Sequence, residues 1–243
     1  MVGKTFIVDL DDTLIKTQTY YDFALIHLLE CVIPALGEES PGVRAIIQTV
    51  TEIDGARVRE HGFGDAKRLA GSYVLAYKKL CEDARMKPSG EIIDKVYKIG
   101  MVPTNPETYK NIKLMSGVKE TLDFLVEQDD ELILYTRGPD KTQKAKIQAP
   151  HLDRWFKEQH IVNDKNGAVL SKIVSSRQKE KCCSVGDYLD CDILPALEIG
   201  IKAIYIPSNS GWLETGITKS LMANPGFLRF REILEIKQHY GKL

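Results

Sequence analysis

Short apolar runs rich in β-branched residues alternate with helical patterns along most of this chain. The first run, KTFIVDL at residues 4–10, lacks the polar alternation of a half-exposed strand, which favours a strand buried on both faces, as in a parallel sheet. Similar runs follow at 131–136, 160–162, 182–187 and 202–207, with helical patterns between them. The sequence therefore predicts a doubly wound α/β fold, whose ligands bind outside the carboxyl ends of the strands.

The alternation is interrupted once, between the first two predicted strands. Residues 16–113 carry apolar residues at three- and four-residue spacing, which predicts helices at 19–36, 40–53, 64–84 and 89–100. A chain of 243 residues is long enough for a core with an inserted domain. We expect an α/β core domain at 1–15 and 114–243, a helical cap domain at 16–113, and a last helix within 227–243.

The charge of the chain is balanced, with 33 Lys and Arg against 34 Asp and Glu, for a formal net charge of −1. Net charge therefore provides no general attraction to nucleic acid or to an anionic membrane. We expect the partner to be a small molecule that is bound locally, and the protein to be a monomer or a homodimer.

The sequence also indicates a cellular setting. Asp9, Asp11 and Asp12 interrupt the amino-terminal apolar stretch, unlike a secretory signal, and no uninterrupted apolar run approaches the roughly 20 residues of a membrane helix. The five cysteines are odd in number and form no CxxC pair, so neither a disulfide framework nor a zinc site is indicated. We expect a cytoplasmic protein.

Two aspartates, Asp9 and Asp11, end the first predicted strand. Carboxylates this close, in an apolar environment, need either a cation or a shared proton to offset their repulsion. Phosphoryl transfer requires such a cation, together with a nucleophile in line with phosphorus and an acid for the leaving oxygen. Asp9 and Asp11 are therefore candidates for the nucleophile and the acid.

The segment DLDDT at 9–13 resembles the DxDx[TV] motif of the haloacid dehalogenase-like (HAD) hydrolase superfamily, and three further motifs follow in the family's order. The resemblance implies that Asp9 attacks phosphorus and that Asp11 first protonates the leaving group and then activates water. It also implies a Mg²⁺ cofactor that Asp9 and Asp11 ligate. In family members, the residue at the position of Asp11 ligates the ion through its backbone carbonyl. Asp12 occupies a variable position, where capping a turn is the simpler role.

Thr136 and Arg137 end the second predicted strand, where the family carries a Ser or Thr. There the Thr136 hydroxyl would donate to a phosphate oxygen, and Arg137 would also contact the phosphate. Without Asp9, the simpler reading of Thr136 is a cap for the following helix. Arg137 could equally face water.

The family's third motif is a lysine that steadies the phosphoryl oxygens, and two residues compete for it. Lys165 follows the strand-like run at 160–162, where ligands collect, and is therefore the preferred catalytic and substrate-binding residue. Lys172 lies within a helical pattern, where a solvated side chain is the default. The family's usual Lys-Pro pair is absent.

The segment GDYLDCD at 186–192 matches the family's GDxxxxD motif. Gly186 would allow a tight turn, Asp187 would bind Mg²⁺, and Asp192 would bind it through water or orient the cluster. Asp192 has an alternative role as a cap at a helix amino terminus, and Asp190 is expected to point away.

The resemblance thus implies a Mg²⁺-dependent phosphatase that acts on a small phosphorylated metabolite through an aspartyl phosphate. Three alternatives remain: a sugar-phosphate phosphotransferase or mutase, a haloacid dehalogenase, and a phospho-signalling module without turnover. In this family the cap commonly contacts the leaving group. Its candidate residues here are Thr17, Gln18, Tyr20, Tyr21, Arg57, Arg59, His61 and Lys67.

Overall fold

The computed structural model describes residues 3–208 and 218–243. The chain forms two compact units: the first comprises Met1–Thr17, Asn111–Arg137 and Lys146–Leu243, and the second comprises Gln18–Lys110 and Gly138–Ala145. These limits lie close to the predicted boundaries, except that 138–145 groups with the second unit. Use of the second unit as a cap stays a prediction.

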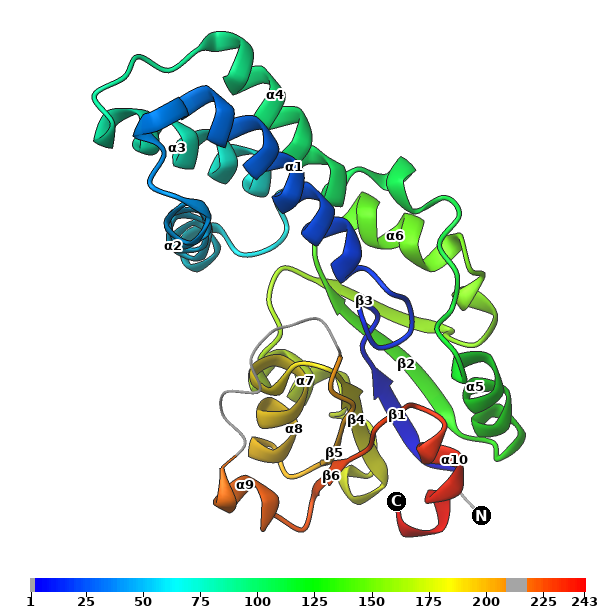
Figure 1. Cartoon of the computed structure of the whole chain (residues 1–243). Helices are drawn as coiled ribbons and strands as arrows, with labels where there is room; N and C mark the ends of the chain where they lie inside the picture. Colours follow the sequence, from blue (N-terminus) through cyan, green and yellow to red (C-terminus); the bar gives the residue numbers. More distant parts are fainter. Residues whose placement is uncertain (1–2, 209–217) are drawn as a thin grey trace. The chain divides into compact units, whose positions relative to one another are not determined.

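The first unit is built on a six-stranded, fully parallel sheet, which confirms the predicted doubly wound α/β fold (Figure 1). The strand order is β3-β2-β1-β4-β5-β6, so the order reverses beside β1, where β2 lies on one side and β4 on the other. Ligands in such sheets bind at this switch. The strands are β1 Thr5–Val8, β2 Glu131–Arg137, β3 Glu158–Val162, β4 Cys182–Gly186, β5 Lys202–Tyr205 and β6 Phe227–Arg229.

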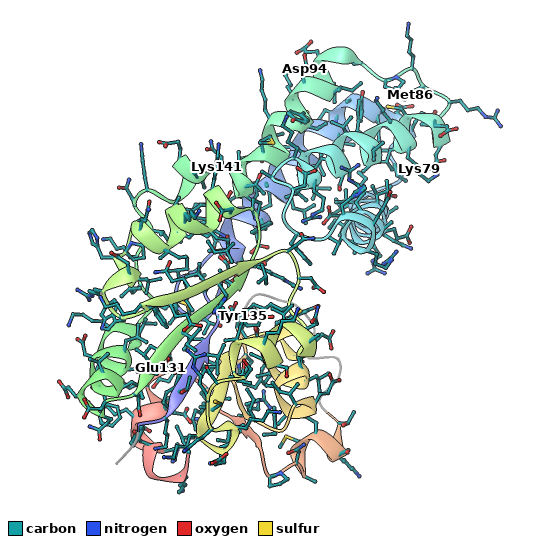
Figure 2. All side chains as sticks on the ribbon, turned by 180° about the vertical axis from the view of Figure 1, so that it is seen from behind. Lys79, Met86, Asp94, Glu131, Tyr135 and Lys141 are labelled. Atoms are coloured by element: carbon teal, nitrogen blue, oxygen red, sulfur yellow. The ribbon has the colours of Figure 1, made fainter. Side chains whose placement is uncertain are left out.

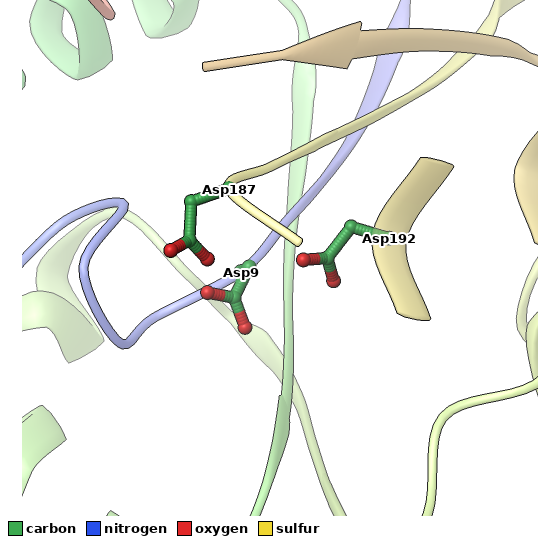
Figure 3. A group of neighbouring side chains, drawn as sticks. All are labelled: Asp9, Asp187 and Asp192. Carbon is green, nitrogen blue, oxygen red and sulfur yellow. The ribbon is translucent and has the colours of Figure 1, made fainter. Parts of the chain in front are cut away.

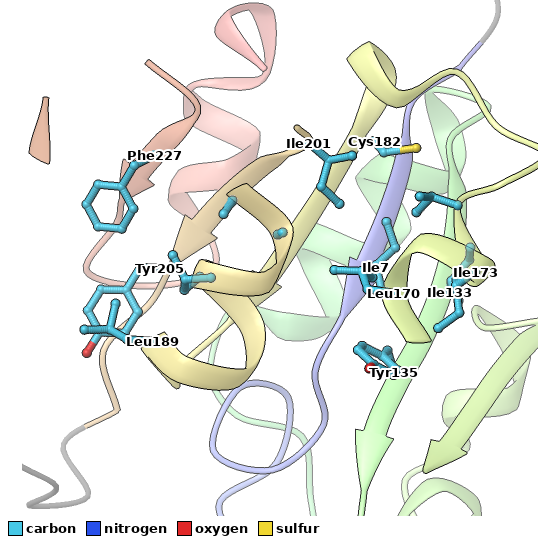
Figure 4. Packing of buried hydrophobic residues seen from close by; sticks show 14 of the residues in the cluster. Ile7, Ile133, Tyr135, Leu170, Ile173, Cys182, Leu189, Ile201, Tyr205 and Phe227 are labelled. Carbon is cyan, nitrogen blue, oxygen red and sulfur yellow. The ribbon is translucent and has the colours of Figure 1, made fainter. Parts of the chain in front are cut away.

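Burial explains why the strand sequences are continuously apolar. All four residues of β1 and all five of β4 are buried, because helices cover the sheet. Ile7 of β1 and Ile133 of β2 pack with Leu170 and Ile173 of α7 in one buried cluster (Figure 4). The helices of this unit are α5 Val118–Glu127, α7 Gly167–Ile173, α8 Leu194–Glu198, α9 Lys219–Met222 and α10 Glu235–Gln238. Helix α6, Asp140–Gln148, belongs to the second unit up to Ala145 and to the first unit from Lys146.

The predicted last helix at 227–243 is wrong in extent. Phe227–Arg229 forms strand β6, which pairs with Ala203–Tyr205 of β5, and α10 covers only Glu235–Gln238. Phe227 is buried in the core cluster, where its ring stacks on that of Tyr205. Burial at the sheet edge therefore overrides the local helical pattern.

The second unit is helical, as its periodicity predicts. It contains α1 Gln18–Leu36, α2 Val43–His61, α3 Arg68–Asp83 and α4 Gly90–Met101. These helices share an apolar core that includes Leu28 of α1, Ile46 of α2, Tyr73 of α3 and Val96 of α4. Charged side chains such as Lys79 and Asp94 lie on the outside (Figure 2).

By length and composition alone, the segment Gln18–Glu39 could cross a membrane. Core helices of other proteins meet the same criterion, so it is weak evidence. In this structure the helix α1 buries Ala24, Leu28, Val32 and Leu36, at four-residue spacing, in the core of the second unit.

Candidate active site

Three aspartates gather where β1 and β4 end. Asp9 follows β1, Asp187 follows β4, and Asp192 lies in the π-helical turn Leu189–Ile193. Each offers a carboxylate oxygen, and these oxygens lie within 4.8 Å of one another (Figure 3). They meet because β1 and β4 are parallel neighbours in register, with Val8 opposite Val185.

A buried lysine, Lys165, neutralises part of this charge. Its Nζ donates to Asp9 Oδ1 and, at 2.7 Å, to Asp192 Oδ1, and the residue is 5% exposed. It occupies the loop between β3 and α7, as expected for the third motif. The competing Lys172 is exposed on α7.

The carboxyl groups still outnumber the cations. Burial raises the pKa of Asp9 to about 7; the charge of Lys165 opposes this, and the charges of Asp192 and Asp11 add to it. Burial also raises the pKa of Asp187 to about 8, with further contributions from Asp9 and Asp192. Burial lowers the pKa of Lys165, but the two aspartates outweigh it and raise the pKa above its ordinary value.

Such an arrangement suits a divalent cation. The cluster offers only carboxylate oxygens, the ligands that Mg²⁺ and Ca²⁺ prefer, and a cation would offset the burial and the repulsion that raise the pKa values of Asp9 and Asp187. Zinc favours nitrogen and sulfur ligands instead. The donor set therefore fits the magnesium that the sequence motifs imply.

The side chain of Asp11, also a predicted metal ligand, lies outside this group of three. Its Oδ1 accepts a hydrogen bond of 2.7 Å from Nζ of Lys146, a residue of α6 that is 2% exposed. Sequence reasoning missed Lys146, because a lysine in a helix is by default solvated. The sequence offered no signal for it, because only the fold shows which side of α6 is buried.

Thr136 and Arg137 end β2, next to β1 in the sheet. Thr136 is 1% exposed and pairs with Ile161 of β3. Arg137 donates to Cys191 Sγ at 2.8 Å, and its guanidinium carbon lies 5.4 Å from the ring centre of Tyr188. Arg137 thus packs on the fourth-motif segment, and the phosphate contacts of both residues stay predictions.

Gly186 ends β4, where Asp192 packs closely against it. Its φ is not in the left-handed region, so a tight left-handed turn does not require it. A Cβ added here would instead lie 2.4 Å from Cγ of Asp192. Asp192 Oδ2 also accepts from Tyr188 N at 3.1 Å, so Asp192 caps its turn while it contacts Lys165. Asp190 is exposed.

No protein-family model and no curated protein matches the sequence. Solved structures do match over nearly the whole chain. A haloacid dehalogenase-like family hydrolase from Xanthomonas campestris has a TM-score of 0.72 at 19% identity, and covers 96% of this chain and 88% of that one. The chain has the haloacid dehalogenase-like fold.

Two further matches indicate how broad this fold is. YfnB from Bacillus subtilis, assigned to the HAD-hydrolases and crystallised with magnesium, has a TM-score of 0.64 at 16% identity, covering 99% of this chain and 100% of that one. A 2-haloacid dehalogenase from Pseudomonas syringae pv. Tomato DC3000 has a TM-score of 0.57 at 17% identity, covering 99% of each chain. The HAD-like fold therefore does not choose between reactions.

Asp12, the variable residue of the first HAD motif, caps a turn in this structure. Its φ is +58°, and its carboxylate accepts from Thr17 N at 3.0 Å and from Thr17 Oγ1 at 3.1 Å. Thr17 is 1% exposed. The hydrogen bonds from Thr17 to Asp12 account for a threonine at this position. Contact between Thr17 and substrate stays a prediction.

The other predicted cap candidates of this HAD-like chain belong to the second unit. Gln18 donates to Asp22 at 2.9 Å, and the ring of Tyr20 meets the ring of Tyr109 edge-on at 5.0 Å. Their contact with substrate stays a prediction. Tyr21 and Arg57 are half-buried, and Arg59, His61 and Lys67 are exposed.

Proposed function

We propose that this protein is a Mg²⁺-dependent phosphatase that hydrolyses a small-molecule phosphomonoester through an aspartyl phosphate on Asp9. One observation carries the proposal: three carboxyl groups within 4.8 Å, at the switch point of the sheet, with a buried lysine bonded to two of them. An excess of buried carboxylates at a ligand-binding edge is costly unless a cation joins them. A phosphate ester is the substrate class that such a cation serves.

Asp9, Asp187 and Asp192 would hold the ion, together with the backbone carbonyl of Asp11. When bound, Mg²⁺ would offset the carboxylate charge and polarise the phosphate oxygens. Lys165 keeps Asp9 in place and contributes positive charge beside the phosphoryl group. Thr136 would donate its hydroxyl hydrogen to a phosphate oxygen, with Arg137 as a second phosphate contact.

The reaction has two steps. First, a carboxylate oxygen of Asp9 attacks phosphorus, the bond from phosphorus to the alcohol oxygen breaks, and that oxygen takes the proton of the Asp11 carboxyl group. Second, water attacks phosphorus and gives a proton to the Asp11 carboxylate, while the bond between phosphorus and Asp9 breaks. Inorganic phosphate leaves, and both aspartates return to their starting states.

The second unit would act as a cap that contacts the leaving group, and the substrate would be a phosphorylated metabolite in the cytoplasm. This assignment is supported by the length of the helical insertion between the first two motifs. A sugar-phosphate mutase would use the same groups, and differs only in how well water is excluded. A dehalogenase has no need of Asp11.

The test is release of inorganic phosphate from an aryl phosphate and from a panel of nucleotides, sugar phosphates and phosphoglycolate. We expect activity with Mg²⁺ and its loss on chelation, and Asp11→Asn should lower turnover by about a hundredfold or more. Metal-independent halide release from a haloacid would favour the dehalogenase. A stable aspartyl phosphate whose lifetime Asp11→Asn does not change would favour the signalling module.

The two candidate lysines provide a matched pair of variants. Lys165→Met should lower phosphate release by about a hundredfold, because Lys165 contacts the nucleophile. Lys172→Met should leave the rate unchanged, because Lys172 is exposed on α7. The opposite ranking would make our assignment of the third motif wrong.

A further inference from the structure

A second buried lysine lies among the charged groups of the first unit. Lys146 is 2% exposed, and its Nζ lies 2.7 Å from Asp11 Oδ1, whose side chain is 28% exposed. The two residues are 135 positions apart in sequence, so the fold brings them together. In the reaction described above, Lys146 has no role.

The placement of Lys146 is unusual for a lysine. Along α6 the residues Thr142, Gln143, Lys146 and Ile147 are all buried, whereas Lys141 and Lys144 are exposed. Burying an ammonium group costs several kcal/mol unless a charged partner offsets the loss of hydration. The carboxylate of Asp11 is such a partner, and a Met of similar length would fill the same space without that cost.

Asp9 and Asp11 therefore each accept a hydrogen bond from a different lysine. Lys165 bonds Asp9 and Asp192, and Lys146 bonds Asp11. Asp11 is thereby held outside the group of three carboxylates that offers a metal site. An ammonium group can donate to a carboxyl oxygen whether or not that carboxyl carries its proton, so the contact is compatible with both steps of the reaction.

We propose that Lys146 is the positioning residue of Asp11: it fixes the carboxyl group that exchanges protons with the leaving oxygen and with water. This inference rests on the proposed function. Lys146 acts through Asp11, to which its Nζ donates. Its removal should therefore affect only what Asp11 does.

A double-mutant cycle tests this dependence, with kcat/KM for an alkyl phosphate in Mg²⁺ as the measurement. In the native background, Lys146→Met should lower kcat/KM by about ten- to a hundredfold, since a misplaced acid loses most of its effect. In the Asp11→Asn background, the same substitution should change kcat/KM by less than about twofold. Equal factors in the two backgrounds, or no loss in the native one, would overturn the proposal.

The leaving group provides a readout that a purely structural role would not alter. A nitrophenolate needs little help from an acid, and kcat/KM reports only the steps up to formation of the aspartyl phosphate. Lys146→Met should therefore lower kcat/KM for the alkyl ester at least about fivefold more than for the nitrophenyl ester. Equal losses for both esters would contradict our assignment.

Lys144→Met is the matched control, because Lys144 lies on the same helix with an exposed side chain paired to Asp140 at 2.8 Å. This variant should leave kcat/KM unchanged for both the alkyl and the nitrophenyl ester. If Lys146→Met does not fold, as judged by its thermal transition, Lys146→Arg in both backgrounds takes its place in the cycle.

Two further measurements distinguish failure of the proposed function from failure of this inference alone. Absence of Mg²⁺-dependent phosphate release by the native protein, or its persistence in Asp9→Asn, would overturn the proposed function and this inference with it. A native enzyme that depends on Asp9 and Mg²⁺, with additive Lys146 and Asp11 effects, would overturn this inference alone.

Discussion

The two ends of the same sheet carry charged clusters that differ in balance. At the amino ends of β2 and β3, Arg177 donates to Glu131 at 2.6 Å and to Glu158 at 2.6 Å. Hydrogen bonds from Arg177 lower the pKa of Glu131, and those from His160 and Arg177 lower the pKa of Glu158. Figure 2 labels Glu131 at the start of β2 and Tyr135 near its other end.

At the carboxyl ends, by contrast, the acids are buried and exceed the bases by more. Asp9, Asp187 and Asp192 surround Lys165, and the pKa values of Asp9 and Asp187 are raised rather than lowered. We call the amino end matched, because both of its half-exposed glutamates accept from Arg177, and the carboxyl end unmatched, because its buried acids keep raised pKa values and suit a cation. Burial of acids in mutual contact thus marks the carboxyl end as the candidate active site.

The largest expected effect is at the nucleophile. Asp9→Asn removes the attacking carboxylate and should lower phosphate release by about a thousandfold or more, because no other group reaches phosphorus in its place. Phosphate assays together with trapping of the phosphoenzyme would measure it. Retention of native activity by this variant would show that Asp9 is not the nucleophile.

Asp187→Asn should separate metal binding from folding. It removes one of the repelling carboxyl groups, so the metal-free variant should gain about 1 kcal/mol of unfolding free energy. Native protein should gain about 2 to 3 kcal/mol at a Mg²⁺ concentration roughly a hundredfold above its Kd, and the variant much less. Thermal melts with Mg²⁺ and with chelator give both values. Asp190→Asn is the control, because Asp190 is exposed, and this variant should have native stability under both conditions.

Gly186→Ala should disturb the unmatched end through its geometry. The added Cβ would meet the Asp192 carboxyl group at 2.4 Å, so Asp192 must move away from Lys165. We expect a loss of about 1 to 3 kcal/mol in unfolding free energy. Weaker Mg²⁺ binding, by about tenfold, should accompany it. Calorimetric titration would check the second effect, and native affinity would show that Asp192 need not stay in place.

The smallest effect is expected at the matched end. Arg177→Met should lower the unfolding free energy at neutral pH by about 1 kcal/mol, since Glu131 and Glu158 are each more than a third exposed. Their folded-state pKa values lie below the unfolded value of about 4.3, so the contribution is complete above that pH. It is lost as the pH falls through the lowered values.

Denaturant unfolding between pH 7 and pH 3 would measure this loss. The unfolding free energies of the native protein and of Arg177→Met should converge as the pH falls. Lys172→Met serves as the control for a surface charge on α7, and phosphate release should be unchanged in both variants. A stability difference that stays constant to pH 3 would mean that Arg177 stabilises by packing rather than by charge.

Sequence patterns predicted the parts of the site that follow from strand ends. Asp9 and Asp187 follow buried strands, and parallel strands bring such residues to one edge of a sheet. Lys165 was preferred to Lys172 by the same reasoning, and the structure places it against Asp9. These inferences needed only the local period of apolar residues and the rule that parallel strands share their ends.

The sequence by itself thus determined the parallel α/β sheet, the helical insertion and the edge where the acids meet, because periodic burial is written into neighbouring residues. Only the tertiary structure decided that Phe227–Arg229 is a strand, that Gly186 makes room for Asp192, and that Lys146 bonds Asp11. Each of these depends on contacts that no local pattern contains. A buried lysine or an edge strand is stable only beside its distant partner.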